Sequence, residues 1–227
     1  MSRRPSRSSG PKGRRGKPKR QAPSETVEVM VDSVGAQGDG LAHWAGQTLF
    51  IPGALAGEQV RIKTGAKRGD GVACTLVDVV TASPQRAEPV CPHFAQCGGC
   101  ALQHLQATAY AQWKRDRVAE VLAKRGFTDT VVLDPVLIGA ATRRRVTLTA
   151  HRRGGRVDLG FNARSSHDIV AVDHCPLLVA ALDSLKNDLP ELLRVALAAG
   201  ARARPSLTAR PTGADTPLEA PAPPTPA

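Results

Sequence analysis

The sequence predicts a mainly β protein of the α+β class with a disordered segment at each end. Short runs that alternate apolar and polar residues fall between residues 26 and 80 and again between 142 and 172, which is the period of half-buried strands. Only the segments 110–125 and 177–197 carry a helical apolar pattern. Hydrophobic residues make up 41% of the 227 residues and aromatic residues only 3%, so the core must consist mainly of Val, Leu, Ala and Ile.

Residues 1–24 are predicted to be a disordered basic tail, because they contain Arg, Lys, Ser, Gly and Pro and almost nothing apolar. The first twenty residues hold nine Lys and Arg and no acid, which leaves 22 basic and 20 acidic residues elsewhere. The tail is either a solubilising segment or an arm that binds nucleic-acid phosphates regardless of base sequence, and its single sign of charge favours the arm. The predicted contacts are Arg14, Arg15, Lys17, Lys19 and Arg20.

Residues 25–82 are predicted to form a small antiparallel barrel, OB-like in arrangement. Alternation begins in the run 26–34, and further β-like runs cover 48–51, 59–63 and 72–80, with glycine-rich turns between them. This block holds four basic and seven acidic residues, so any contact with nucleic acid must be local. The candidates are Arg61, Lys63, Lys67 and Arg68.

Residues 83–130 are predicted to be a cysteine-rich loop followed by a helix over 110–125. We expect Thr108 to cap the start of this helix and Gly126 to end it. Its apolar residues recur at roughly helical spacing, and Tyr110 and Trp113 among them are expected to anchor the core rather than to stack on bases. The other members of this apolar set are Val118, Val121 and Leu122.

Residues 131–204 are predicted to form a second, partial β unit that ends in a helix. The spacing indicates a hairpin around Gly154 and Gly155 plus a third strand, then a helix over 177–197 that is interrupted at Pro190. Because side chains alternate along a strand, only the first and third members of the Arg triplet 143–145 can face the same way. The nucleic-acid contacts expected here are Arg143, Arg145, Arg152 and Arg153. Residues 205–227, with seven prolines, are predicted to be a disordered tail.

The most specific signal is the segment Cys91–Cys100, which carries three cysteines separated by five and two residues. Cys97 and Cys100 flank two glycines, which allow a tight loop that points backbone amides at sulfur. Cys175 can supply a fourth thiolate, and the set fits either a [4Fe–4S] cluster or zinc. His93 and His104 are alternative zinc ligands, although a lone histidine is more often a packing residue. Cys74, the fifth cysteine, lies in a β run and is expected to be inert.

Several of these segments resemble, in order, the S-adenosylmethionine-dependent RNA (uracil-5-)-methyltransferase family, which forms 5-methyluridine in ribosomal or transfer RNA. The segments 38–42 and 49–58 are similar to the TRAM domain of that family, an OB-like RNA-binding barrel. The loop 91–104 resembles its cluster loop, and 143–145, 159–161 and 175–176 resemble its central β domain. The resemblance implies a [4Fe–4S] cluster on Cys91, Cys97, Cys100 and Cys175. It also implies an RNA partner, ribosomal rather than transfer RNA, and a monomer.

Catalysis in that family needs a Rossmann-like domain for S-adenosylmethionine and a cysteine thiolate that attacks uracil. No cysteine follows Cys175, and no glycine-rich strand-to-helix turn is present, so no catalytic or cofactor-binding residue is predicted. We therefore expect an N-terminal portion of such an enzyme, truncated, frameshifted or partial, that binds RNA and a cluster without transferring a methyl group.

Two alternatives to this interpretation are a free-standing TRAM-type RNA-binding protein with an iron–sulfur or zinc site, and a zinc-ribbon-like structural protein. The second would need paired zinc-ligand spacings, which are absent. The sequence contains neither a secretory signal nor an apolar run long enough to cross a membrane, so a cytoplasmic location is expected.

Overall fold

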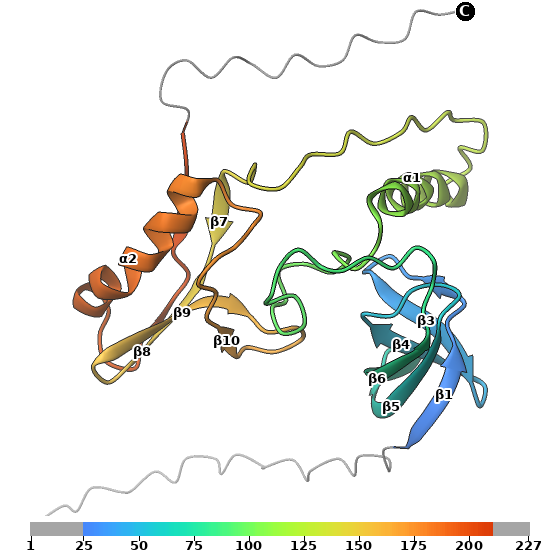
Figure 1. Ribbon diagram of the computed structural model, residues 1–227, viewed down its shortest axis with the longest axis horizontal. Helices are drawn as coiled ribbons and strands as arrows, with labels where there is room; N and C mark the ends of the chain where they lie inside the picture. The colour runs from blue at the N-terminus through green and yellow to red at the C-terminus, as the bar shows by residue number, and fades with distance from the viewer. Residues whose placement is uncertain (1–24, 211–227) are drawn as a thin grey trace, which may run out of the picture.

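The computed structural model describes residues 25–210, and within them it confirms a mainly β fold with two helices (Figure 1). The first unit is a six-stranded sheet with the strand order β1-β5-β6-β4-β3-β2. Its strands are β1 (Thr26–Met30), β2 (Ser33–Val34), β3 (Asp39–Trp44), β4 (Gln47–Pro52), β5 (Gln59–Arg68) and β6 (Gly71–Thr81). The predicted basic tail, with Arg14, Arg15, Lys17, Lys19 and Arg20, lies outside the described residues.

The sequence pattern predicted a purely antiparallel sheet, and the structure corrects this prediction. Strands β4 and β6 pair in parallel, with Leu49 opposite Val72, whereas its other strand pairs are antiparallel. Gly71 at the start of β6 permits this approach, because a Cβ there would lie 2.2 Å from the carbonyl oxygen of Thr48. Strand β1 also contacts β3, which is far from it in the strand order, so the sheet curls onto itself.

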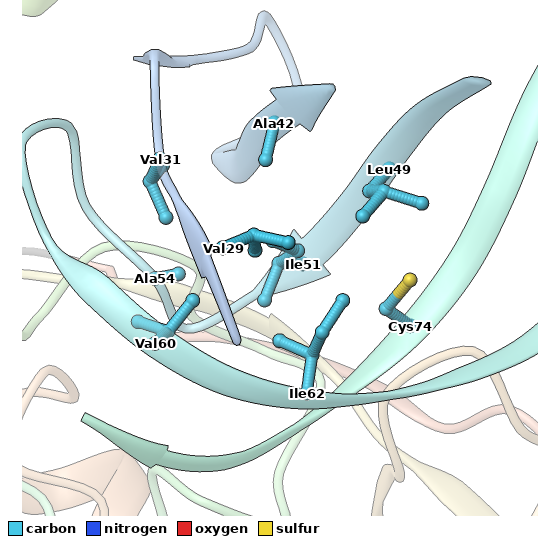
Figure 2. Close-up of a cluster of buried hydrophobic side chains, with 9 residues drawn as sticks. All are labelled: Val29, Val31, Ala42, Leu49, Ile51, Ala54, Val60, Ile62 and Cys74. Atoms are coloured by element: carbon cyan, nitrogen blue, oxygen red, sulfur yellow. The ribbon is translucent and has the colours of Figure 1, made fainter. Parts of the chain in front are cut away.

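The inner face of the curled sheet forms an aliphatic core, as the composition predicted (Figure 2). Alternate residues of β1, β4 and β5 point inward, so each strand contributes every second side chain. The buried members are Val29, Val31, Ala42, Leu49, Ile51, Ala54, Val60, Ile62 and Cys74.

Helix α1 (Ala107–Lys124) begins three residues before its predicted start. Thr108 does not cap it, because the helix already begins after Gln106, whose side chain makes no capping bond. Gly126 follows its last turn with φ +87°, the left-handed conformation that glycine adopts after a helix, as predicted.

The apolar contacts of α1 with the first unit and the loop before it come from its first half. Tyr110 and Trp113 cover the buried Leu55, Leu102 and Leu105, so both are anchors as expected. Val118 and Val121 are instead 51% and 60% exposed, which makes their predicted place in the core wrong within the described structure.

The second unit contains a four-stranded sheet in the order β10-β9-β8-β11 and a separate pair, β12-β7. The strands are β7 (Arg145–Thr147), β8 (Thr149–Arg153), β9 (Arg156–Asn162), β10 (Ile169–Val170), β11 (Arg202–Ala203) and β12 (Ser206–Thr208). Strands β8 and β9 form the predicted hairpin around 154–155, and β10 is its third strand. Because β12 pairs with β7, the segment assigned to a proline-rich tail contains a strand at its beginning.

Helix α2 (Ala180–Ala196) runs through Pro190 without a break, so the predicted interruption is wrong. Leu182, Lys186 and Leu189 are buried on one face of the helix, and α2 contacts β8 and β9. Burial of this face stabilises the helix by more than the roughly 3 kcal/mol that an internal proline costs. Within residues 25–210, neither helix has the length and hydropathy needed to span a membrane.

Candidate functional site

The four cysteines that were predicted to act together line one small pocket between the loop 91–100 and the second unit. This pocket has a free volume of about 20 Å³. Aromatic and aliphatic side chains supply half of the remaining lining residues, and no carboxylate from residues 25–210 lines it. The lining residues are Cys91, Phe94, Cys97, Gly99, Cys100, Gln103, Arg143, Phe161, Val172 and Cys175.

Backbone contacts with the end of β9 hold the loop in this position. Cys97 forms an isolated bridge with Ala163, and the amide of Gly98 donates to the carbonyl of Asn162 at 2.9 Å. Gly98 is required at this point, because a Cβ there would lie 2.9 Å from the same Asn162 oxygen. The loop is therefore fixed by a strand that lies more than sixty residues later in the chain.

Cys175 reaches the pocket from the segment that precedes α2. Its amide donates to Oδ1 of Asp183 at 2.9 Å, which ties it to the first turn of that helix. Its side chain is buried in the same apolar cluster as Cys97. The pocket therefore joins the cysteine loop to the core of the second unit.

Two of the thiols in the pocket, Cys97 and Cys100, have a raised pKa, which favours their protonated form. Burial raises the pKa of Cys97, although the amide of Gly99 donates to its sulfur at 3.4 Å. Burial likewise raises the pKa of Cys100, against the opposing effects of Gln103 and Arg143. Metal binding must therefore displace protons from these sulfurs, as it does at thiolate sites in general.

The donor set fits a thiophilic metal group. All five cysteines are free thiols, and four of them face this pocket. Gln103 accepts a hydrogen bond from the amide of Cys91 at 3.2 Å, while its buried Nε2 has no partner among residues 25–210. The sulfurs do not converge on one point: in the described part of the chain, no three His, Cys, Asp or Glu side chains are arranged to hold an ion.

Neither histidine considered as an alternative ligand lines the cysteine pocket. His104 is 1% exposed and lies under Phe94, with ring centroids 5.3 Å apart. The fifth cysteine, Cys74, lies in the core of the first sheet, where burial raises its pKa.

A buried ion pair, which the sequence analysis did not identify, lies beside His104. Glu58 is fully buried and accepts hydrogen bonds from Nε of Arg86 at 2.6 Å and from the amides of Leu55 and Ser83 at 2.8 and 3.2 Å. Burial alone would raise the pKa of Glu58, but these hydrogen bonds, above all that from Arg86, lower it. The carboxylate therefore stays charged and fastens β5 to the segment 83–86.

Burial lowers the pKa of His104 to about 4, and the charges of Arg86 and Arg164 act in the same direction while Glu58 opposes them. The folded pKa lies below that of an unfolded histidine, so the unfolded chain takes up the proton first. Stability from His104 is present above about pH 6.5 and falls as the pH drops toward 4.

We expect the free energy of unfolding to fall by about 2 kcal/mol between pH 7 and pH 5 because of this histidine. Urea titrations at the two pH values measure the change in the native chain and in His104→Gln. The variant should lose this part of the pH dependence, and an equal dependence in both chains would contradict the assignment. His43 is exposed, so His43→Gln is the matched control.

The structure divides the predicted basic contacts into paired and unpaired side chains. Arg61 is bound to Glu28 at 2.7 Å, and Arg68 to Asp39 at the same distance. Within residues 25–210 the exposed Lys63, Lys67, Arg143 and Arg145 form no ion pair.

In the second unit, Arg153 is bound to Asp158 at 3.1 Å, and Arg152 donates to the carbonyl of Leu197. Arg143 lines the cysteine pocket and Arg145 begins β7, so the two are not gathered with the basic residues of the first sheet.

Comparison with known proteins shows what the chain is similar to. Residues 20–68 match the TRAM domain. An uncharacterized RNA methyltransferase of Mesorhizobium japonicum is 44% identical over 165 residues, which cover 71% of this chain and 38% of the relative. A counterpart in Caulobacter vibrioides is 41% identical over 166 residues, covering 70% of this chain and 38% of the relative. The 23S rRNA (uracil(1939)-C(5))-methyltransferase RlmD of Pseudomonas entomophila is 37% identical over 170 residues, which cover 73% of this chain and 38% of the relative.

The chain thus spans about two fifths of the length of the curated relatives it matches. The resemblance drawn from its cysteine and glycine motifs is confirmed: this chain carries a TRAM domain and is related, over most of its length, to part of the RNA methyltransferase family that includes 23S rRNA (uracil-C5)-methyltransferases.

Proposed function

We propose that this chain is the RNA-binding and cluster-binding part of an RNA (uracil-5-)-methyltransferase that acts on ribosomal RNA. The observation that carries the proposal is that four free thiols line one pocket in a chain with a TRAM domain. The names of the relatives support ribosomal RNA as the partner. We assign no residue of this chain to methyl transfer and no site in it to S-adenosylmethionine.

Cys91, Cys97, Cys100 and Cys175 would hold the [4Fe–4S] cluster. When bound, the cluster supplies a four-point link between the loop and the second unit. The amide of Gly99 already donates to one of these sulfurs, and the unpartnered Nε2 of Gln103 is a further buried donor beside them. Such donors stabilise the negative charge on thiolate ligands.

The second candidate is a TRAM-type RNA-binding protein in which the same four thiols hold structural zinc. The all-thiolate donor set favours it equally, because zinc and iron–sulfur clusters share this ligand chemistry.

Anaerobic purification of the full chain, followed by iron, sulfide and zinc analysis, separates the two candidates. We expect about four iron and four sulfide per chain, and binding of ribosomal RNA that weakens with salt. Stoichiometric zinc without iron would establish the second candidate instead. A chain that holds metal but binds no RNA would overturn both.

A further inference from the structure

A second cavity, separate in function from the cysteine pocket, lies where the two units and the loop between them meet. It is an open groove of about 780 Å³ between the β5–β6 end of the first sheet, the loop 86–104 and the turn after β9. Figure 1 shows this loop running between the two β units. Within the described part of the chain, its lining contains no carboxylate and four cationic side chains, which are Lys67, Arg68, Arg86 and Arg164.

Two of these four cations are not neutralised by acids among residues 25–210. Arg86 is paired with the buried Glu58, and Arg68 with Asp39. Lys67 and Arg164 have no carboxylate partner within the described residues 25–210. The groove therefore presents a surplus of positive charge, contributed by the first sheet and by the turn after β9.

Arg164 is held in place by contacts that leave its charge available. Its Nη2 donates to the carbonyl of Cys100 at 3.0 Å, and its guanidinium lies 5.7 Å from the ring centroid of Phe94. Neither partner carries a negative charge. An arginine oriented in this way is suited to a phosphate oxygen.

Aromatic side chains form the part of the groove next to Arg164. Phe94 is half-buried in the wall, and His104 lies behind it. Neither ring nitrogen of His104 has a hydrogen-bond partner among the described residues, although both are buried. Buried polar groups are nearly always paired, so the unpaired ring of His104 is an unusual feature of the wall behind Phe94.

We propose that this groove binds the sugar–phosphate backbone of single-stranded RNA, with Lys67 and Arg164 contacting phosphates and Phe94 offering a surface for a base. The inference rests on the proposed RNA-binding function and gives it a location. Positive charge beside an aromatic ring is how proteins bind single strands without reading their sequence. The volume suits a ligand of the size of one or two nucleotides.

An acidic peptide is the competing occupant, since it would also satisfy the two cations. RNA is favoured because the cations lie beside the half-buried ring of Phe94, and a base has a flat face for such a ring whereas acidic side chains do not. The TRAM match over 20–68 includes Lys67 and so places the groove partly within a domain of an RNA methyltransferase family.

The test uses the full, metal-loaded chain and a fluorescein-labelled 12-nucleotide oligouridine, with affinity measured by anisotropy over a salt series. We expect Lys67→Gln and Arg164→Gln each to weaken binding several-fold. Each should also reduce the slope of log K against log salt by about 0.7, the value for one lost contact with a single strand. The controls are Lys124→Gln and Arg125→Gln, exposed residues at the end of α1 that do not line the groove.

Metal analysis of each variant keeps the result interpretable, because Arg164 contacts the cysteine loop whereas Lys67 does not. If Lys67→Gln binds like the controls while the native chain binds RNA, the groove assignment is wrong and the proposed function stands. If the native chain binds no RNA, the proposed function itself fails. Equal effects of Lys67→Gln on a 12-base-pair RNA duplex, or competition by polyglutamate at matched charge, would also overturn the single-strand assignment.

Discussion

Glu58→Ala is expected to destabilise the first unit by about 3 kcal/mol or more, since removal of one partner of a buried pair leaves the other charge uncompensated. Arg86 would lose two hydrogen bonds, and the amides of Leu55 and Ser83 would lose their acceptor. A loss of this size is a large part of the stability of a domain. Urea unfolding followed by tryptophan fluorescence measures it, because Trp44 packs against the core of the sheet.

Glu88→Ala is the matched control, because Glu88 is exposed and lies close to Glu58's partner in the sequence. The free energy of unfolding of Glu58→Gln should lie between those of Glu58→Ala and Glu88→Ala. The side-chain oxygen of Gln can still accept a hydrogen bond from one amide, although the charge is lost. If Glu58→Ala unfolds at the same urea concentration as the control, the Glu58–Arg86 pair contributes nothing to stability.

Cys175→Ser is expected to abolish stoichiometric iron and sulfide and to loosen the second unit. The residue is buried beside Cys97 and is the only one of the four proposed ligands outside the loop 91–100. Without it the loop and the segment before α2 lose their common link. Hydrogen exchange of peptides from 145–172 should therefore become at least tenfold faster, as expected when a local structural unit opens more readily.

The control for Cys175→Ser is Cys74→Ser, which changes a buried thiol of the first sheet and leaves the pocket intact. That variant should retain its iron and the slow exchange of the second unit. Full iron and sulfide in Cys175→Ser would remove this residue from the ligand set.

The sequence was sufficient wherever structure follows from neighbouring residues. Alternation located the strands, Gly154 and Gly155 the hairpin, and Gly126 the end of α1. The sequence was insufficient where contacts between distant segments determine the structure. The parallel pairing of β4 with β6 depends on how the sheet curls, and helix α2 tolerates Pro190 because three of its side chains are buried against other elements.

The candidate site could likewise be predicted in part from the sequence. Spacing grouped three of the cysteines, and the lone Cys175 was the remaining choice for a fourth; the structure places all four on one pocket. Sequence could not show that Arg61 and Arg68 are paired while Lys67 is not, because their partners come from other strands. Nothing near His104 in the sequence signals its burial, which arises from the packing of the loop onto Glu58 and Arg86.

The uneven placement of the pocket's cysteines also has a consequence for how the protein is made. Cys91, Cys97 and Cys100 leave the ribosome together, but Cys175 follows 75 residues later. At ordinary rates of translation this delay is about 4–15 s. During that interval three solvated thiols form a local chelating loop, open to zinc or copper ions in the cell. The pocket closes only once Cys175 and the strand β9 have been synthesised, so under the proposed ligand assignment the order in which ions and chain segments arrive would decide which metal the pocket takes up.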